Sequence, residues 1–260
     1  MSNYAFKWNI FEVSKTKRDC GCLFGSMAKD DWYTHCTSQS TEITKVAVSR
    51  KNQVTLSCNV MLLEYQDRRI LVDVGPPYHP ETSEEDEQDP VDATPNRLTG
   101  VLREHDLLPK EITDIIITSR DRDHAGGLIY KDKTGDAKLR FPNAVHYCHR
   151  GEHIRKRPNP IPQADLALDM LDEAGKINWI GEKTEIFPGI TMIPTDGPSA
   201  FSSAIQVKMG ADRVLLPSDL CPTLWHMNIS TISSYDDNPE TTFTEKDDLI
   251  SSAIKEGYCM

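Results

Sequence analysis

The chain has 260 residues, of which 38% are hydrophobic and 27% charged, and its formal net charge at pH 7 is −11. This length can bury a substantial core, as one large domain or two small ones. The acidic surplus argues against nucleic acid and anionic membranes as partners, because both favour a basic protein face.

The mean hydropathy of −0.48 and the lack of any apolar run near the roughly 20 residues of a membrane span predict a soluble protein. The first residues, MSNYAFKWNIFEV, lack the basic start and apolar core of a secretory signal. Seven irregularly spaced cysteines are a poor disulfide framework, and we expect free thiols. These features together predict a cytoplasmic protein.

The N-terminal third predicts β-structure followed by a helix. Residues 4–36 suggest a strand and a loop. Runs 54–65 and 69–74 are rich in β-forming residues and flank a turn at Gln66-Asp67, which predicts a hairpin. Helical spacing of apolar residues over 98–108 predicts a helix that Pro109 stops.

Residues 79–96, between the hairpin and this helix, are acidic, contain prolines and lack aromatic residues. Such a composition is typical of a mobile surface loop. We expect no specific function in it.

The stretch Ile112–Leu128 is the strongest candidate for a site. The apolar run Ile115-Ile116-Ile117 has the length of a buried strand, and a polar cluster from Thr118 to His124 follows it. Gly126 and Gly127 then allow the chain to turn sharply. In α/β proteins, strands that deliver ionisable side chains at their ends build sites in this way. Composition alone also allows a solvated loop in which arginines and aspartates pair.

The second half of the chain predicts alternating strands and helices. His146 and His149 fall on one predicted strand with a separation that places them on opposite faces, so we expect structural roles. The predicted strands are 141–147, 177–180, 184–187, 190–194 and 213–216, and the predicted helices are 161–175 and 243–254.

The polar cluster resembles the hallmark of the metallo-β-lactamase-fold hydrolases, Thr-His-x-His-x-Asp-His followed by x-Gly-Gly. Ser119 and Asp121 stand where two metal-binding histidines belong. The matching residues are Thr118, Asp123, His124, Gly126 and Gly127.

The resemblance extends from about residue 22 to the end and is closest to the lactonase-like branch, the N-acyl-homoserine lactonase type. Asp73 matches an Asp-x-Gly whose Asp orients a metal-binding group, although a simple strand-end cap is an alternative. In Thr195-Asp196-Gly197-Pro198-Ser199, Pro198 stands in the place of a metal-binding His. Asp219 matches the Asp that bridges two metals, and the last His of the family has no counterpart.

The resemblance implies a single domain over residues 1–260 with the αββα sandwich fold, two mixed β-sheets flanked by helices. It also implies that the dinuclear zinc site is lost. The first metal site retains only Asp121, whereas Asp123, His124 and Asp219 would hold at most one ion. Two carboxylates and one imidazole suit Zn, Mn or Fe.

Three functions follow as hypotheses. The first is ester- or lactone-type hydrolysis of a small carbonyl compound with at most one metal. The second is a metal-independent cyclase, isomerase or lyase that uses His124, Asp123 and Asp121 in acid–base catalysis. The third is a non-catalytic protein that binds a small molecule.

In the second and third hypotheses, one arginine beside Asp121, Asp123 and Asp219 would replace the lost metal charge. We expect a small-molecule ligand, and the sequence leaves a homodimer open. The candidate substrate-binding residues are Ser119, Arg120, Arg122, Asp196 and His226.

Overall fold

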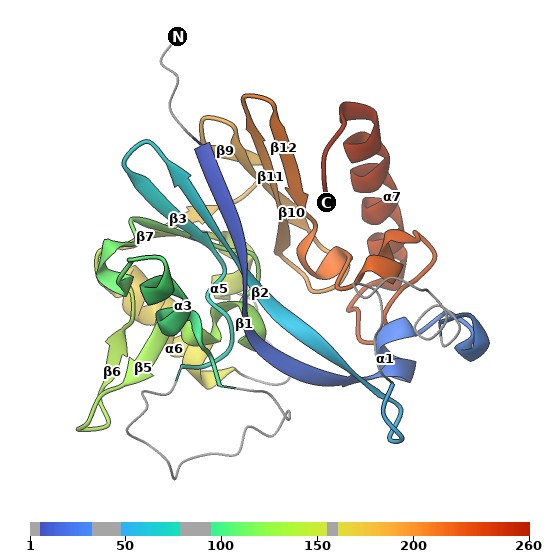
Figure 1. Ribbon diagram of the computed structural model, residues 1–260, viewed down its shortest axis with the longest axis horizontal. Helices are drawn as coiled ribbons and strands as arrows, with labels where there is room; N and C mark the ends of the chain where they lie inside the picture. Colours follow the sequence, from blue (N-terminus) through green and yellow to red (C-terminus); the bar gives the residue numbers. More distant parts are fainter. Residues whose placement is uncertain (1–5, 33–47, 79–94, 155–160) are drawn as a thin grey trace. The chain divides into compact units, whose positions relative to one another are not determined.

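The computed structural model describes residues 6–32, 48–78, 95–154 and 161–260 (Figure 1). The chain forms two compact units, each built from two stretches of sequence. Unit 1 comprises Met1–Thr16 and Ser57–Gly181, and unit 2 comprises Lys17–Leu56 and Glu182–Met260. The expectation of one domain over all 260 residues stays a prediction.

A six-stranded sheet carries the strand ends at which the candidate site begins. Its order is β1 (Phe6–Asp19), β2 (Gln53–Tyr65), β3 (Arg68–Val72), β4 (Asp114–Ile117), β7 (Val145–His149) and β8 (Ile177–Ile180). The hairpin of β2 and β3 is antiparallel, as predicted, and β3, β4, β7 and β8 run parallel. Parallel strands end at one edge of a sheet, so the residues that follow β3 and β4 come together there.

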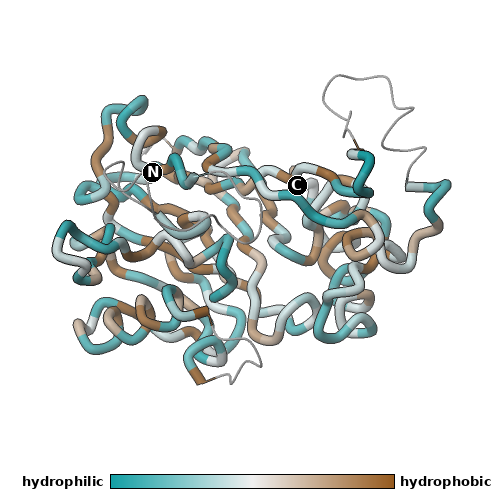
Figure 2. The backbone as a smooth tube through the Cα atoms, turned by 90° about the horizontal axis from the view of Figure 1, so that it is seen from below, coloured by the Kyte–Doolittle hydropathy of each residue, from teal (hydrophilic) through white to brown (hydrophobic). Residues whose placement is uncertain are grey.

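The core of unit 1 explains the continuous apolar run in β4. Ile115 and Ile117 on one face join a core cluster with residues of α3 (Leu98–Glu104) and α6 (Pro162–Glu173). Ile116 on the opposite face is also fully buried. A strand buried on both faces has no polar alternation, which is typical of a central parallel strand. Figure 2 shows hydrophobic positions, in brown, recurring between hydrophilic ones, in teal, along the backbone.

Short elements complete unit 1. They are η1 (Pro109–Glu111), α4 (Arg122–Ala125), η2 (Gly126–Leu128), β5 (Ile129–Lys131), β6 (Ala137–Leu139) and α5 (Arg150–Ile154). The predicted helix 98–108 ends earlier, at Glu104, because Asp106 adopts a left-handed φ of 57° and Leu107 N donates to Leu102 O.

The predicted acidic loop 79–96 falls almost entirely outside the described residues. Its end is described, and Asn96 is buried there rather than on the surface. The Asn96 amide donates to the carbonyl oxygens of Val74 and Pro76.

Unit 2 contains a four-stranded antiparallel sheet in the order β12 (Asp212–Leu216), β11 (Ser202–Met209), β10 (Ile190–Thr195) and β9 (Thr184–Phe187). It also contains α1 (Cys20–Phe24), η3 (Ser218–Leu220), η4 (Leu224–Met227) and α7 (Pro239–Glu256). Helix α7 packs Ala253 against Leu215 of β12. It begins four residues before the predicted start because the Asn238 side chain caps it and Pro239 occupies its first turn.

Two further expectations can be compared with the structure. The six cysteines among the described residues are free thiols, and Cys36 lies outside that part of the chain. None of the described helices has both the length and the apolar character that a membrane crossing requires.

Candidate functional site

Asp73 directly follows β3, and its side chain is hydrogen-bonded to Thr118, the residue after β4. Its backbone adopts a left-handed conformation with φ of 62°. Few residue types other than Gly, Asn and Asp tolerate this region, and strain of this kind often accompanies function. Its Oδ1 accepts a hydrogen bond from Thr118 N at 2.8 Å, and its Oδ2 accepts one from Thr118 Oγ1 at 2.7 Å. The carboxylate therefore fixes the first residue after β4.

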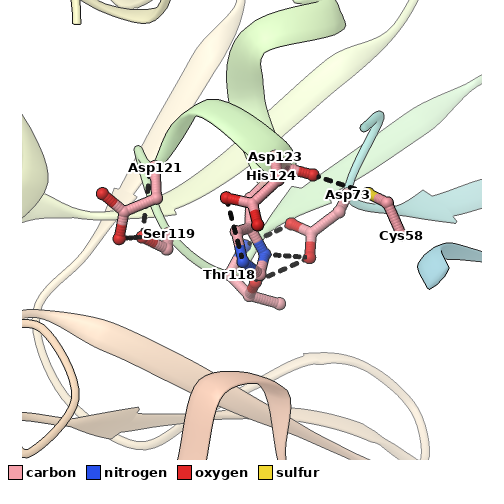
Figure 3. Close-up of polar contacts among 7 residues, drawn as sticks. All are labelled: Cys58, Asp73, Thr118, Ser119, Asp121, Asp123 and His124. Carbon is pink, nitrogen blue, oxygen red and sulfur yellow. Dashed lines mark hydrogen bonds and ion pairs between the residues drawn. The ribbon is translucent and has the colours of Figure 1, made fainter. Parts of the chain in front are cut away.

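The same Asp73 Oδ2 lies 2.8 Å from His124 Nδ1 (Figure 3). This is the contact expected if Asp73 orients the ring of His124. From this contact we assign the proton of the neutral ring to Nδ1, so that Nε2 carries the lone pair. Nε2 lies 3.9 Å from Asp123 Oδ1. A histidine held in this way can bind a cation or accept a proton through Nε2.

Ser119 and Asp121, at the positions of the family's two histidines, bond to each other. Ser119 Oγ donates to Asp121 Oδ2 at 2.8 Å and accepts from Asp121 N at 3.0 Å. In Figure 3 this pair lies apart from the group formed by Asp73, Thr118 and His124. The pair closes a small turn within the loop.

The arginines of the loop take different places. The guanidinium of Arg120 forms ion pairs with Glu152 Oε2 at 3.7 Å and with Asp165 Oδ1 at 3.1 Å. These carboxylates, on α5 and α6, are not the ones considered in the sequence analysis as partners of an arginine. Arg122 is the first residue of α4 and is half-buried.

In unit 2, Asp196 lies in a loop that is hydrogen-bonded to α7. Its Oδ1 accepts from Phe201 N at 2.9 Å, and its own N–H donates to the carboxylate of Glu245. Glu245 also accepts from Gly197 N at 3.1 Å. Burial raises the pKa of Glu245, and the hydrogen bonds from these backbone N–H groups partly oppose this rise. The structure thus gives the exposed Asp196 a role in the turn.

His226 is buried, and its two ring nitrogens bond inside unit 2. Nε2 lies 2.9 Å from Leu23 O, and Nδ1 lies 2.7 Å from Thr223 Oγ1. Burial lowers the pKa of His226 to about 4. These contacts are those of a structural histidine, and the proposed site does not include His226.

Asp219 lies on η3 directly after Ser218, which has a left-handed φ of 52°. Burial raises the pKa of the nearby Asp236 to about 6, and the charges of Asp219 and Asp237 add to this effect. Asp219 therefore belongs to an acidic group within unit 2.

The structure divides the predicted residues between the units. Ser119, Arg120, Asp121, Arg122, Asp123 and His124 lie in unit 1, and Asp196, Asp219 and His226 lie in unit 2. Four residues make contacts that the sequence did not indicate: Cys58, Glu152, Asp165 and Glu245. The Sγ atom of Cys58 lies 3.0 Å from Asp123 O. No local motif marks these residues, because their partners are distant in sequence.

Comparison with known proteins assigns the family. The sequence model of the Metallo-beta-lactamase superfamily (Lactamase_B) matches residues 54–224, more than half of the chain. The chain therefore belongs to the metallo-β-lactamase superfamily, as the polar cluster predicted. No curated protein sequence matches it significantly.

Solved structures confirm the expected α/β fold of the metallo-β-lactamase type. A probable metal-dependent hydrolase from Staphylococcus aureus is similar, with a TM-score of 0.78 and 24% identity over 99% of this chain and 88% of that one. AidC, a dizinc quorum-quenching lactonase, has a TM-score of 0.75 and 15% identity over 96% and 84% of the respective chains. An N-acyl homoserine lactone hydrolase has a TM-score of 0.69 and 18% identity over 96% and 90%.

Proposed function

We propose that the chain is a hydrolase-type enzyme that acts on a small carbonyl compound, an ester or a lactone, with at most one bound metal ion. The observation that carries the proposal is the Asp73–His124 contact at 2.8 Å, which orients the ring. The lactonases among the structural neighbours support the substrate class.

The donor set argues against a pair of ions. At the positions of the first ion, Ser119 and Asp121 are hydrogen-bonded to each other, and the side chain of Pro198 has no ligand atom. Of these three positions, only Asp121 offers a carboxylate to a first ion.

One ion would have His124 Nε2 and the Asp123 carboxylate as neighbouring donors. When bound, such an ion would act as a Lewis acid toward the carbonyl of the substrate. Asp73 keeps the Nδ1 proton in place and stabilises the ring when Nε2 binds a positive charge. A role for Asp219 as a further ligand stays a prediction from the sequence.

A metal-independent mechanism is the second candidate, and the same contact favours it. A His whose Nδ1–H is held by a carboxylate can act as a general base through Nε2. His124 would take a proton from water or from the substrate, and Asp73 would stabilise the imidazolium that forms.

Metal content and turnover, measured on the same samples, separate these possibilities. We would determine bound metal by plasma mass spectrometry after dialysis and after readdition of Zn, Mn or Fe. Turnover of an ester and lactone panel would be followed with and without a chelator. His124→Ala is the test variant, Asp219→Ala tests the predicted ligand, and His105→Ala, at an exposed position, is the control.

About one equivalent of metal, lost in His124→Ala together with chelator-sensitive turnover, would support the hydrolase with one ion. Turnover that resists the chelator but requires His124 would support the metal-independent mechanism. Two equivalents of metal would overturn the limit of one ion. No turnover under any condition would overturn an enzymatic function and leave a binding protein.

A further inference from the structure

Arg120 is a buried charge at a position that the family motif leaves open. It stands between the two positions of the motif's first histidines, and its side chain is only 8% exposed. A buried guanidinium is costly unless carboxylates compensate it. Its partners Glu152 and Asp165 come from two different helices, so this compensation is built from distant parts of unit 1.

Both partners lie on helices that have buried residues. Glu152 is fully buried in α5, directly after β7. Asp165 lies in the first turn of α6, and the neighbouring Ala164 and Leu168 of α6 belong to the hydrophobic core. An ion pair with such partners fixes the guanidinium relative to the core and not to a mobile surface.

Cys148, which is fully buried on β7, is influenced by the charges of both Glu152 and Asp73. Burial raises the pKa of the Cys148 thiol well above its usual value, and the charges of Glu152 and Asp73 both add to this. Cys148 on β7 therefore lies within electrostatic range of both groups.

The loop from Thr118 to His124 is thus held at several points by side-chain contacts. Asp73 fixes its two ends, the Ser119–Asp121 pair closes its middle, and Arg120 connects it to α5 and α6. In a metal site the ion itself commonly orders such ligands.

We propose that Arg120, through Glu152 and Asp165, is a positioning residue that holds the Thr118–His124 loop in its site conformation without a metal ion. This inference deepens the proposed function, because it concerns the loop that presents His124. It would allow the loop to present His124 although Ser119 and Asp121 stand at the positions of the family's histidines.

The test uses the full chain after metal removal with a chelator. Hydrogen exchange of the 118–125 amides reports the order of the loop, and imidazole ¹⁵N shifts report the Nδ1–H form of His124. The test variants are Arg120→Met, Glu152→Gln and Arg120→Lys, which keeps the charge. The control is Arg68→Met, because Arg68 pairs with Asp114 at the opposite end of β4 at 2.9 Å.

In the metal-free wild type, we expect a protected loop and a single Nδ1–H form. Arg120→Met and Glu152→Gln should raise exchange in the loop about tenfold or more, while amides of β2 and β3 remain protected, and should mix the two ring forms. Arg120→Lys should restore part of the protection, and Arg68→Met should leave the loop unchanged.

A loop that loses protection in the wild type on metal removal would overturn the proposal. Wild-type exchange and ring form in both Arg120→Met and Glu152→Gln would also overturn it. If these variants do not fold, Asp165→Asn carries the same test, because Asp165 is 33% exposed and easier to replace. None of the readouts depends on turnover, so failure of the proposed catalysis is distinguishable from failure of this inference.

Discussion

At the scale of single residues, Asp73 combines a backbone role with a side-chain role. Its left-handed φ is one that Asn also tolerates, whereas its two carboxylate oxygens accept three hydrogen bonds. Asp73→Asn should therefore keep the backbone and disrupt the acceptor pattern. We expect a loss of about 1–3 kcal/mol in the free energy of unfolding and a 10–100-fold loss of activity or metal affinity.

Urea unfolding and turnover measure these two effects. Asp106→Asn is the matched control, because Asp106 also has a left-handed φ, of 57°, but is exposed. It should change stability by no more than about 0.5 kcal/mol. Equal behaviour of the two variants would contradict an orienting role for Asp73.

The residues also show what sequence reasoning can reach. Thr118, Asp123 and His124 follow from one motif whose members are close in sequence, and Asp73 follows from a second motif, Asp-x-Gly, at the end of a strand. The partners of Arg120 do not, because Glu152 and Asp165 lie on helices that only the folded core brings near it. His226 looked like a site residue because its type can bind ligands, but its function depends on three-dimensional contacts that its type does not reveal.

At the scale of elements, the close contact of α7 with the loop after β10 depends on Gly197. A Cβ at this position would lie 2.4 Å from Thr242 Cα and 2.5 Å from Thr242 N. Helix backbone cannot move aside as a flexible side chain would, so Gly197→Ala should destabilise the protein by about 1–3 kcal/mol or more. The midpoint of urea unfolding measures this change.

Gly100→Ala is the control within a helix. Gly100 lies in α3 without a positive φ, and a Cβ there would meet none of the described residues outside its own helix within 4 Å. Alanine there should stabilise the protein by about 0.5–1 kcal/mol. The opposite signs of the two substitutions would confirm that the Gly197 effect arises from the packing of α7.

The elements were largely predictable, and their ends were less so. The β2–β3 hairpin and the buried strand β4 follow from β-rich runs and an apolar triplet. The earlier end of α3 depends on the left-handed Asp106, and the earlier start of α7 depends on the cap by Asn238. Such caps depend on local backbone angles that apolar spacing does not determine.

At the scale of the whole molecule, stability should depend on pH through buried groups. Burial lowers the pKa of both His146 and His226 to about 4, from 6.5. Their contribution is fully present above pH 6.5 and is lost as the pH falls toward 4, by about 3 kcal/mol each. Burial raises the pKa of Asp236 from 3.8 to about 6, so its protonation in the folded state offsets part of this loss.

Urea unfolding at pH 7 and pH 4.5 tests the prediction. His226→Gln should show a smaller difference between the two pH values than the wild type, and Asp236→Asn should show a larger one. His105→Gln, at an exposed position, is the control. A pH dependence that His226→Gln leaves unchanged would contradict the buried neutral form of this histidine.

The interleaving of the two units has a consequence for synthesis on the ribosome. All residues of unit 1 have been made once Gly181 is added, whereas unit 2 still requires Glu182 onward to join Lys17–Leu56. We expect unit 1 to fold first, because Lys17–Leu56 cannot pack with Glu182–Met260 until that second stretch has been made. A chain stalled far enough beyond Gly181 for that residue to have left the ribosome would then already present Asp73 and His124 in contact.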